Sequence, residues 1–139
     1  MQKLREVVFP NGTIDKNIVG QSAKVVAEKC GFAHGDDLKV ILVKAGAYGT
    51  DDLLSKEKMC PVIATYDYLA DWDECIAAAN ANLNVEGKGH SVSIHSNNAE
   101  HIEAAAQVLP VSRFLVNQVC STNNGGSFFN SLSATTTLG

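Results

Sequence analysis

Apolar residues recur along this chain with two periods, which predicts helices interspersed with short strands. Apolar residues three and four positions apart indicate amphipathic helices, and short runs rich in β-branched residues indicate strands. The predicted elements are, in order, helices over residues 1–9 and 22–30, strands over 38–44 and 61–68, a helix that begins after Asp71, a strand over 91–95, a helix over 99–109 and a strand over 113–119.

Residues that favour helix ends lie at several of these boundaries. Ser22 is suited to cap the second helix, and Gly31 is suited to end it because glycine tolerates a left-handed backbone. Asp71 opens a sequence that resembles a capping box. Asn97 or Asn98 can cap the last predicted helix. These local signals support the helix boundaries independently of the apolar spacing.

The strand and helix order predicts an α/β fold. Residues 90–119 read as a strand, a helix and a second strand, which is about the length that a crossover between parallel strands needs. Parallel strands with covering helices predict a three-layer α/β/α arrangement with a mostly parallel sheet. We find no internal repeat, and we expect a single domain over residues 1–139. The segment after Cys120 contains turn residues but no periodic element.

Composition excludes several classes of function. An apolar share of 45%, a charged share of 19% and a net charge of −4 are typical of a soluble globular protein rather than a disordered one. Lysine and arginine are scattered, so nucleic acid is not expected as a partner. No apolar run approaches the ~20 residues that span a bilayer, so we expect no membrane partner and a cytoplasmic location. The four cysteines form no C-x-x-C pair, which argues against zinc and against a dense disulfide scaffold, so no metal is expected.

Two residues stand out as candidates for chemistry. Glu57 lies in a charged loop before a predicted strand. Most such glutamates are solvated surface carboxylates, but a carboxylate at the end of an α/β sheet can also accept both hydroxyls of a ribose. His90 follows Gly87-Lys88-Gly89 and opens a strand, where an imidazole can accept a proton near neutral pH or can serve only as a hydrogen-bonded structural residue.

A third candidate region is the glycine- and asparagine-rich segment after the last strand. Asn123, Asn124 and the glycines that follow could form a nest of backbone N–H groups for an anion, although a flexible loop is the more common outcome. Phe128 could line an apolar pocket, or it could anchor the loop to the core.

Five motifs follow one another along the chain: Asn11-Gly12 with Ile18-Val19-Gly20-Gln21 and Gly31-Phe32; Glu57-Lys58-Met59-Cys60-Pro61; Gly89-His90-Ser91; Phe114-Leu115-Val116-Asn117; and Ser127-Phe128-Phe129-Asn130 with Thr135-Thr136-Thr137-Leu138-Gly139. In this order they resemble the CoA-acylating aldehyde dehydrogenases, the group that includes succinate-semialdehyde enzymes and the aldehyde half of bifunctional aldehyde–alcohol dehydrogenases. The second motif is similar to the E-K-x-x-P signature of that family and the third to its G-H-[ST] motif. The match covers essentially the whole chain and corresponds to the C-terminal part of the aldehyde dehydrogenase domain.

The resemblance implies an oxidoreductase that uses NAD(P) and coenzyme A to convert a small aldehyde, succinate semialdehyde or acetaldehyde, to an acyl-CoA. By carry-over, Glu57 would bind the nicotinamide ribose and His90 would be the proton acceptor. The loop with Asn123, Asn124 and Phe128 would line the aldehyde pocket. The full-length parent would be a homo-oligomer. A dicarboxylic aldehyde should also need a cationic partner, and Arg113 is the arginine nearest in sequence to this loop.

The chain also departs from the family pattern. None of the four cysteines lies in the nucleophile's motif, and the NAD-binding domain that precedes this region in the family is absent. We therefore expect the chain alone to be inactive. Two alternatives remain: a stand-alone α/β module that binds a partner without catalysis, and an oligomerisation module that uses unpaired strand edges.

Overall fold

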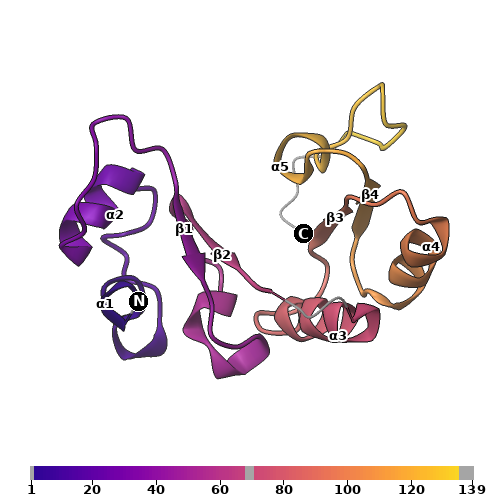
Figure 1. Cartoon of the computed structure of the whole chain (residues 1–139). Coiled ribbons are helices and arrows are strands. Elements are labelled where there is room, and N and C mark those ends of the chain that lie inside the picture. Colours follow the sequence, from indigo (N-terminus) through magenta and orange to yellow (C-terminus); the bar gives the residue numbers. More distant parts are fainter. Residues whose placement is uncertain (1, 68–70, 135–139) are drawn as a thin grey trace. The chain divides into compact units, whose positions relative to one another are not determined.

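Two pairs of parallel strands organise the computed structural model, which describes residues 2–67 and 71–134. The chain divides into two compact units, Met1–Leu69 and Ala70–Gly139. In the first unit β1 (Ile41–Lys44) pairs with β2 (Val62–Thr65), and in the second β3 (Ser91–Ile94) pairs with β4 (Arg113–Val116) (Figure 1). The predicted α/β class with parallel strands is confirmed. One domain over residues 1–139 remains a prediction.

The first unit packs two helices, α1 (Gln2–Val8) and α2 (Ala23–Cys30), with the β1–β2 pair. Its other elements are the short 3-10 helices η1 (Pro10–Gly12), η2 (Gly49–Asp51) and η3 (Leu53–Ser55). The Ser22 hydroxyl accepts a hydrogen bond from the N–H of Val25, and Gly31 ends α2 with φ +70°, so both predicted caps are confirmed.

The core of the first unit lies on one face of its strand pair. Val43 and Val62 are buried there with Leu4, Val26 and Leu54. Because side chains alternate along a strand, Leu42 and Ile63, which are partners in register, lie on the opposite face and are 66% and 53% exposed.

The second unit contains the predicted strand–helix–strand crossover. It consists of α3 (Trp72–Leu83), β3, α4 (Ala99–Val108), β4 and α5 (Cys120–Asn123). The side chain of Asp71 caps α3, and that of Asn98, rather than Asn97, caps α4. Trp72 stacks on His101 with ring centroids 4.1 Å apart, which joins the first turns of the two helices.

The strands are shorter than predicted, because parallel pairing covers only four residues of each strand. Pro61 has no N–H, so the first pair of the β1–β2 ladder is that of Ile41 with Val62. Tyr68, at the end of one predicted strand, lies outside the described residues. The prediction that the segment after Cys120 has no periodic element was wrong for one helical turn, α5.

Candidate functional site

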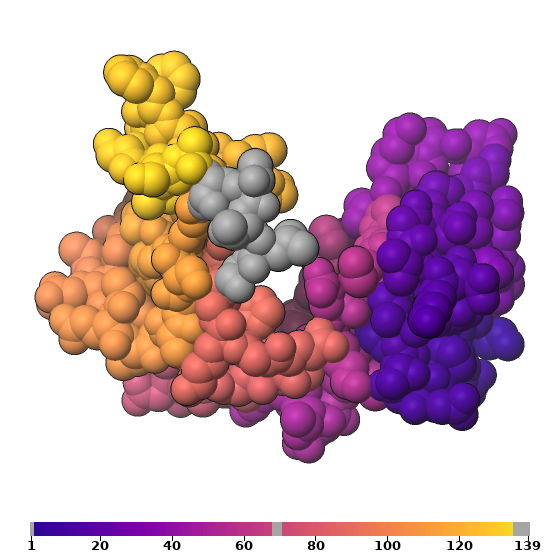
Figure 2. Space-filling view, turned by 180° about the vertical axis from the view of Figure 1, so that it is seen from behind, coloured from indigo at the N-terminus to yellow at the C-terminus, as the bar shows by residue number. Residues whose placement is uncertain are grey.

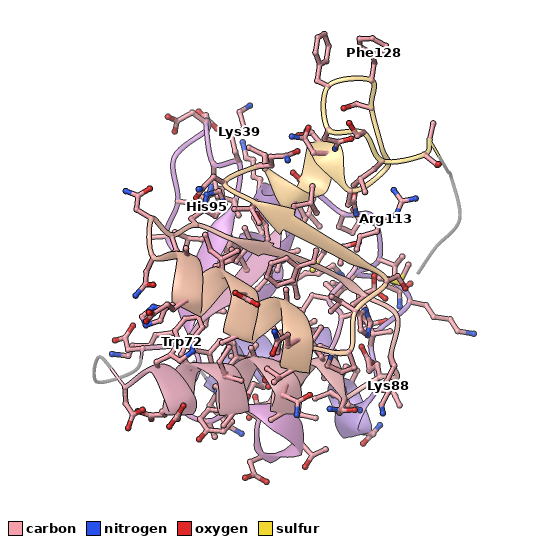
Figure 3. The ribbon with its side chains drawn as sticks, turned by 90° about the vertical axis from the view of Figure 1, so that its right-hand side faces the viewer. Lys39, Trp72, Lys88, His95, Arg113 and Phe128 are labelled. Atoms are coloured by element: carbon pink, nitrogen blue, oxygen red, sulfur yellow. The ribbon has the colours of Figure 1, made fainter. Side chains whose placement is uncertain are left out.

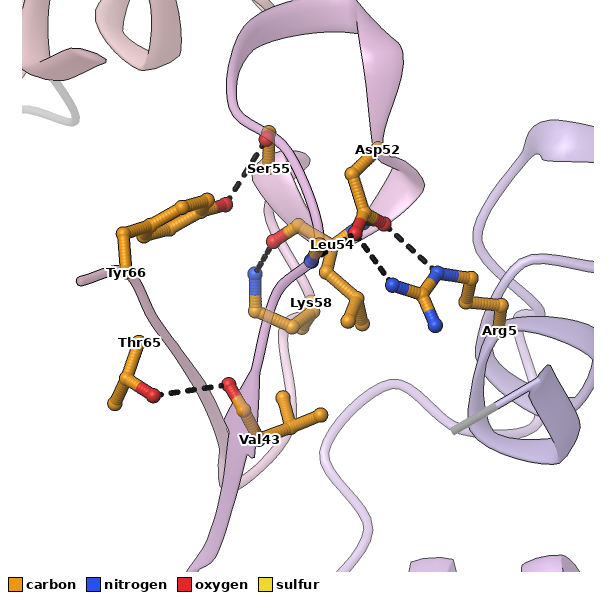
Figure 4. Close-up of polar contacts among 9 residues, drawn as sticks. Arg5, Val43, Asp52, Leu54, Ser55, Lys58, Thr65 and Tyr66 are labelled. Carbon is orange, nitrogen blue, oxygen red and sulfur yellow. Dashed lines mark hydrogen bonds and ion pairs between the residues drawn. The ribbon is translucent and has the colours of Figure 1, made fainter. Parts of the chain in front are cut away.

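The loop that carries Glu57 is anchored by a buried carboxylate. Asp52 is 7% exposed and caps η3 by accepting a hydrogen bond from the N–H of Leu54 (3.0 Å). Arg5 Nε donates to Asp52 Oδ1 at 2.8 Å, and Arg5 Nη2 pairs with Oδ2 (Figure 4). The hydrogen bond from Arg5 is the main cause that lowers the pKa of Asp52 to about 2, with help from the N–H groups of Leu54 and Gly46, although burial acts in the opposite direction. The carboxylate is therefore charged at neutral pH, and it connects this loop to Arg5 in α1.

Lys58 and Lys56 bind backbone carbonyls on either side of Glu57 in sequence. The Lys58 ammonium folds back to donate to the carbonyl oxygens of Leu54 (2.6 Å) and Lys56 (2.7 Å), and Lys56 reaches the carbonyl of Gly12 (2.7 Å). Figure 4 shows Lys58 turned towards the end of η3. Glu57 is exposed between these two lysines. The lysine of the E-K-x-x-P motif thus holds the loop, and the glutamate is presented at the surface before β2.

His90 is exposed and lies immediately before β3. Its Nε2 is 2.9 Å from the carbonyl oxygen of Gly87, and its own carbonyl accepts from the N–H of Ser112 at 3.0 Å. A carbonyl can only accept, so Nε2 must carry the proton, and Nδ1 is the ring nitrogen that can accept one. Gly87 and Gly89 have φ +107° and +103°, a backbone conformation that allows this tight turn.

Glu57 and His90 both lie at the amino side of their strands. In open parallel sheets, ligands usually bind outside the carboxyl ends. Glu57 belongs to the first unit and His90 to the second, so their association in one site remains a prediction.

The third predicted region forms a closed loop rather than an anion nest. The N–H groups of Asn123, Asn124 and Gly126 donate to the carbonyl oxygens of Val119, Cys120 and Asn123, and that of Ser127 donates to the side chain of Asn130. These amides are therefore already used within the chain. Asn123 and Asn124 are half-buried.

Phe128 and its neighbour Phe129 project from this loop. Each is 95% exposed, and the two rings meet edge to face with centroids 6.0 Å apart. Figure 3 shows Phe128 pointing away from the ribbon. The interpretation that Phe128 anchors the loop to the core was wrong, and its role in an aldehyde pocket remains a prediction.

Three of the four thiols lie in surroundings that disfavour a nucleophilic thiolate. Burial raises the pKa of Cys30, Cys60 and Cys120 above its ordinary value, which reduces the thiolate fraction at neutral pH. All four cysteines are free of disulfides. Residues 2–67 and 71–134 contain no cluster of three or more His, Cys, Asp or Glu side chains that could hold a metal ion. In the same residues no helix is long and apolar enough to cross a bilayer.

Two polar arrangements lie near the carboxyl ends of β3 and β4. Asn117, at φ +53°, uses its side-chain amide to accept from the N–H of Ser96 and to donate to its carbonyl, both at 3.0 Å. This bidentate contact ties the two strand ends together. The sequence feature that could have indicated this contact is the asparagine directly after the strand, since asparagine tolerates a left-handed backbone.

Ser93 and His95 form the second arrangement. The Ser93 hydroxyl donates to the carbonyl of Gln118, so it must accept from Nε2 of His95 at 3.2 Å. In a nucleophile–base pair the hydroxyl donates to the imidazole. The pair is therefore structural.

Comparison with known proteins decides the family. No family model matches the chain. A succinate-semialdehyde dehydrogenase (acetylating) from Clostridium kluyveri is 42% identical over 139 residues, all of this chain and 30% of that protein. A sulfoacetaldehyde dehydrogenase from Acholeplasma sp is 35% identical over 127 residues, 91% of this chain and 26% of that protein.

This chain is homologous to a segment of the acylating aldehyde dehydrogenases. The crystal structure of an acetylating aldehyde dehydrogenase from Geobacillus thermoglucosidasius matches 84% of this chain and 25% of its own, with a TM-score of 0.76 and 32% identity. The family resemblance read from the five motifs is thus confirmed. The chain spans less than a third of each of these three family members.

Proposed function

We propose that this chain supplies the Glu57 and His90 segment of an NAD(P)-dependent enzyme that converts an aldehyde and coenzyme A to an acyl-CoA. The observation that supports the proposal is 42% identity over the whole chain to a succinate-semialdehyde dehydrogenase (acetylating). The overall reaction is balanced: aldehyde, NAD(P)⁺ and CoA give acyl-CoA, NAD(P)H and a proton. NAD(P)⁺ supplies the hydride acceptor and CoA the thiol that receives the acyl group.

His90 accepts a proton in this proposal. Its Nε2–H is directed to the carbonyl of Gly87, which fixes the tautomer and leaves Nδ1 as the basic nitrogen. An imidazole has a pKa near neutrality in general, which suits a base that must both take up and release a proton. The exposed position of His90 gives a substrate thiol or water access to Nδ1.

Glu57 fits the role of a ribose ligand. It is an exposed carboxylate on a loop held at both ends, by Asp52 with Arg5 and by the N–H of Gly20 bonded to the carbonyl of Met59. A fixed carboxylate can accept both vicinal hydroxyls without further ordering of the loop.

The loop of residues 120–130 lines the aldehyde pocket in this proposal. Succinate semialdehyde ranks ahead of acetaldehyde as substrate. The purified chain alone has no dehydrogenase activity in this proposal, because none of its four cysteines lies in the motif of the family's nucleophile. We place the complete enzyme in the cytoplasm as a homo-oligomer.

A chimera tests the proposal. The matching segment of the Clostridium kluyveri enzyme is replaced by this chain, and NADH formation is followed with succinate semialdehyde, NAD⁺ and CoA. We expect an active chimera. In it, His90→Asn should reduce kcat by about 10²–10⁴-fold, whereas the control His95→Asn, at the other end of β3, should leave kcat within about twofold.

Glu57→Gln should act differently. It should raise the KM for NAD⁺ about tenfold, the effect of losing one charge-assisted hydrogen bond, while Glu86→Gln serves as its control. Turnover by the 139-residue chain alone, or equal effects of His90→Asn and His95→Asn, would contradict the proposal.

A further inference from the structure

The loop that carries the two phenylalanines is closed at its base by one arginine. Arg113 is the first residue of β4, and its guanidinium donates to the carbonyl of Asn124 at the start of the loop. Its Nη2 donates to the carbonyl of Ser133 at the end of the loop, at 3.3 Å. A single planar group with five N–H donors thus holds both ends of residues 124–133.

Asn130 braces the same loop from within. Its Oδ1 accepts from the N–H groups of Ser127 (2.9 Å) and Leu132 (3.2 Å), and its Nδ2 donates to the carbonyl of Asn123 (2.9 Å). The two ends of the loop pass so close to each other that a Cβ at Gly126 would lie 2.7 Å from the Ser133 carbonyl carbon. The loop therefore has a defined shape although its tip is exposed, and Figure 2 shows that tip (yellow) projecting beyond the rest of its unit.

Arg113 is also the last charged residue of the chain. From Phe114 to Gly139 the sequence contains no Asp, Glu, Lys or Arg. The loop itself can offer a substrate only amide, hydroxyl, backbone, aromatic and aliphatic groups. A guanidinium that already donates to two carbonyls at the base of the loop has fewer donors left for a carboxylate.

We propose that Arg113 is a positioning residue that sets the shape of residues 124–133, and so the place of Phe128 and Phe129, and that it does not bind the carboxylate of a dicarboxylic aldehyde. This replaces the role expected for Arg113 from the sequence. The second half of the proposal rests on the proposed function, whereas the first half is a property of the chain by itself.

Hydrogen exchange in the full 139-residue chain tests the first half. In Arg113→Gln we expect the amides of Ser127 and Leu132 to exchange about tenfold faster or more, because both hydrogen bonds of the guanidinium, to the carbonyls of Asn124 and Ser133, are lost. Arg113→Lys should recover part of the protection, since an ammonium can reach only one of two separated carbonyls as a point donor. Lys88→Gln removes one charge in the same unit, far from the loop (Figure 3), and should change exchange by less than about twofold.

Unchanged exchange in Arg113→Gln would overturn the brace. Should Arg113→Gln fail to fold, Asn130→Ala provides the second variant: it removes the acceptor of both amides and should release them equally. Unchanged exchange in a folded Asn130→Ala would also contradict a braced loop.

The chimera tests the second half by comparing two substrates of equal length, succinate semialdehyde and butanal. If Arg113 only positions the loop, Arg113→Gln lowers kcat/KM for both, and their ratio stays within about twofold. A fall in the ratio of about tenfold or more, through a raised KM for succinate semialdehyde alone, would show a carboxylate contact and overturn this half. An inactive parent chimera counts against the proposed function, and the exchange data still decide the brace.

Discussion

Removing the charge of Asp52 should destabilise the first unit in a pH-dependent manner. Asp52 and Arg5 lie 47 residues apart in sequence, and their side chains are only 4% and 21% exposed. Holding the pKa of Asp52 at about 2, against an ordinary 3.8, corresponds to about 2.5 kcal/mol of folding free energy at neutral pH. We expect Asp52→Asn to lose about 2 kcal/mol at pH 7, since the amide oxygen can still accept from Leu54.

The sign of the pH dependence follows from the lowered pKa. The unfolded chain takes up a proton near pH 3.8 while the folded chain stays ionised to about pH 2, so the stabilisation is complete above the first value and is lost as the pH falls towards the second. It should amount to about 2.2 kcal/mol at pH 4, about 1.3 kcal/mol at pH 3 and about 0.4 kcal/mol at pH 2. Asp52→Asn lacks this titration, so its difference from the wild type should shrink over the same range.

Urea unfolding, followed by the amide NMR signals of Val43 and Leu54, reports on the first unit without a contribution from Trp72 in the second. Asp36→Asn is the matched control, because Asp36 pairs with Lys24 at 2.6 Å but is 97% exposed. Solvent screens such a pair, and no measurable change is expected. A difference between wild type and Asp52→Asn that stays constant from pH 5 to pH 2.5, or an equal effect of Asp36→Asn, would refute the reasoning.

Three further outcomes test the packing. Val43→Ala should cost about 2 kcal/mol in urea unfolding because it opens a cavity at a buried site, whereas Leu42→Ala, on the exposed face, should cost less than about 0.5 kcal/mol; equal costs would show that both faces are covered. Asn98→Ala removes the cap of α4 and should cost about 1 kcal/mol, read from the fluorescence of Trp72; no change would mean that the cap is dispensable. Cys30 should react with a thiol reagent at pH 7.5 more slowly than free cysteine, because it is buried and its pKa is raised; faster labelling would contradict its burial.

Local signals were the most reliable part of the sequence. The caps at Ser22, Asp71 and Asn98 and the left-handed Gly31 are all present, because each depends on side-chain and backbone groups within a few residues. The predicted strands were in the right places, but each was predicted longer than the four residues that pair. Strand length depends on the pairing partner, which a single segment does not contain.

Contacts between distant residues needed the tertiary structure. The sequence alone identified the family, the α/β class and the candidates Glu57 and His90, since motifs and apolar periodicity involve only residues that are close together in sequence. Only the folded chain decided that Arg5 neutralises Asp52, that Arg113 serves the loop carbonyls and that Phe128 stands in solvent. These outcomes depend on contacts between residues that are distant in sequence. Hydrogen bonds and burial at such contacts produce no periodic pattern in the sequence.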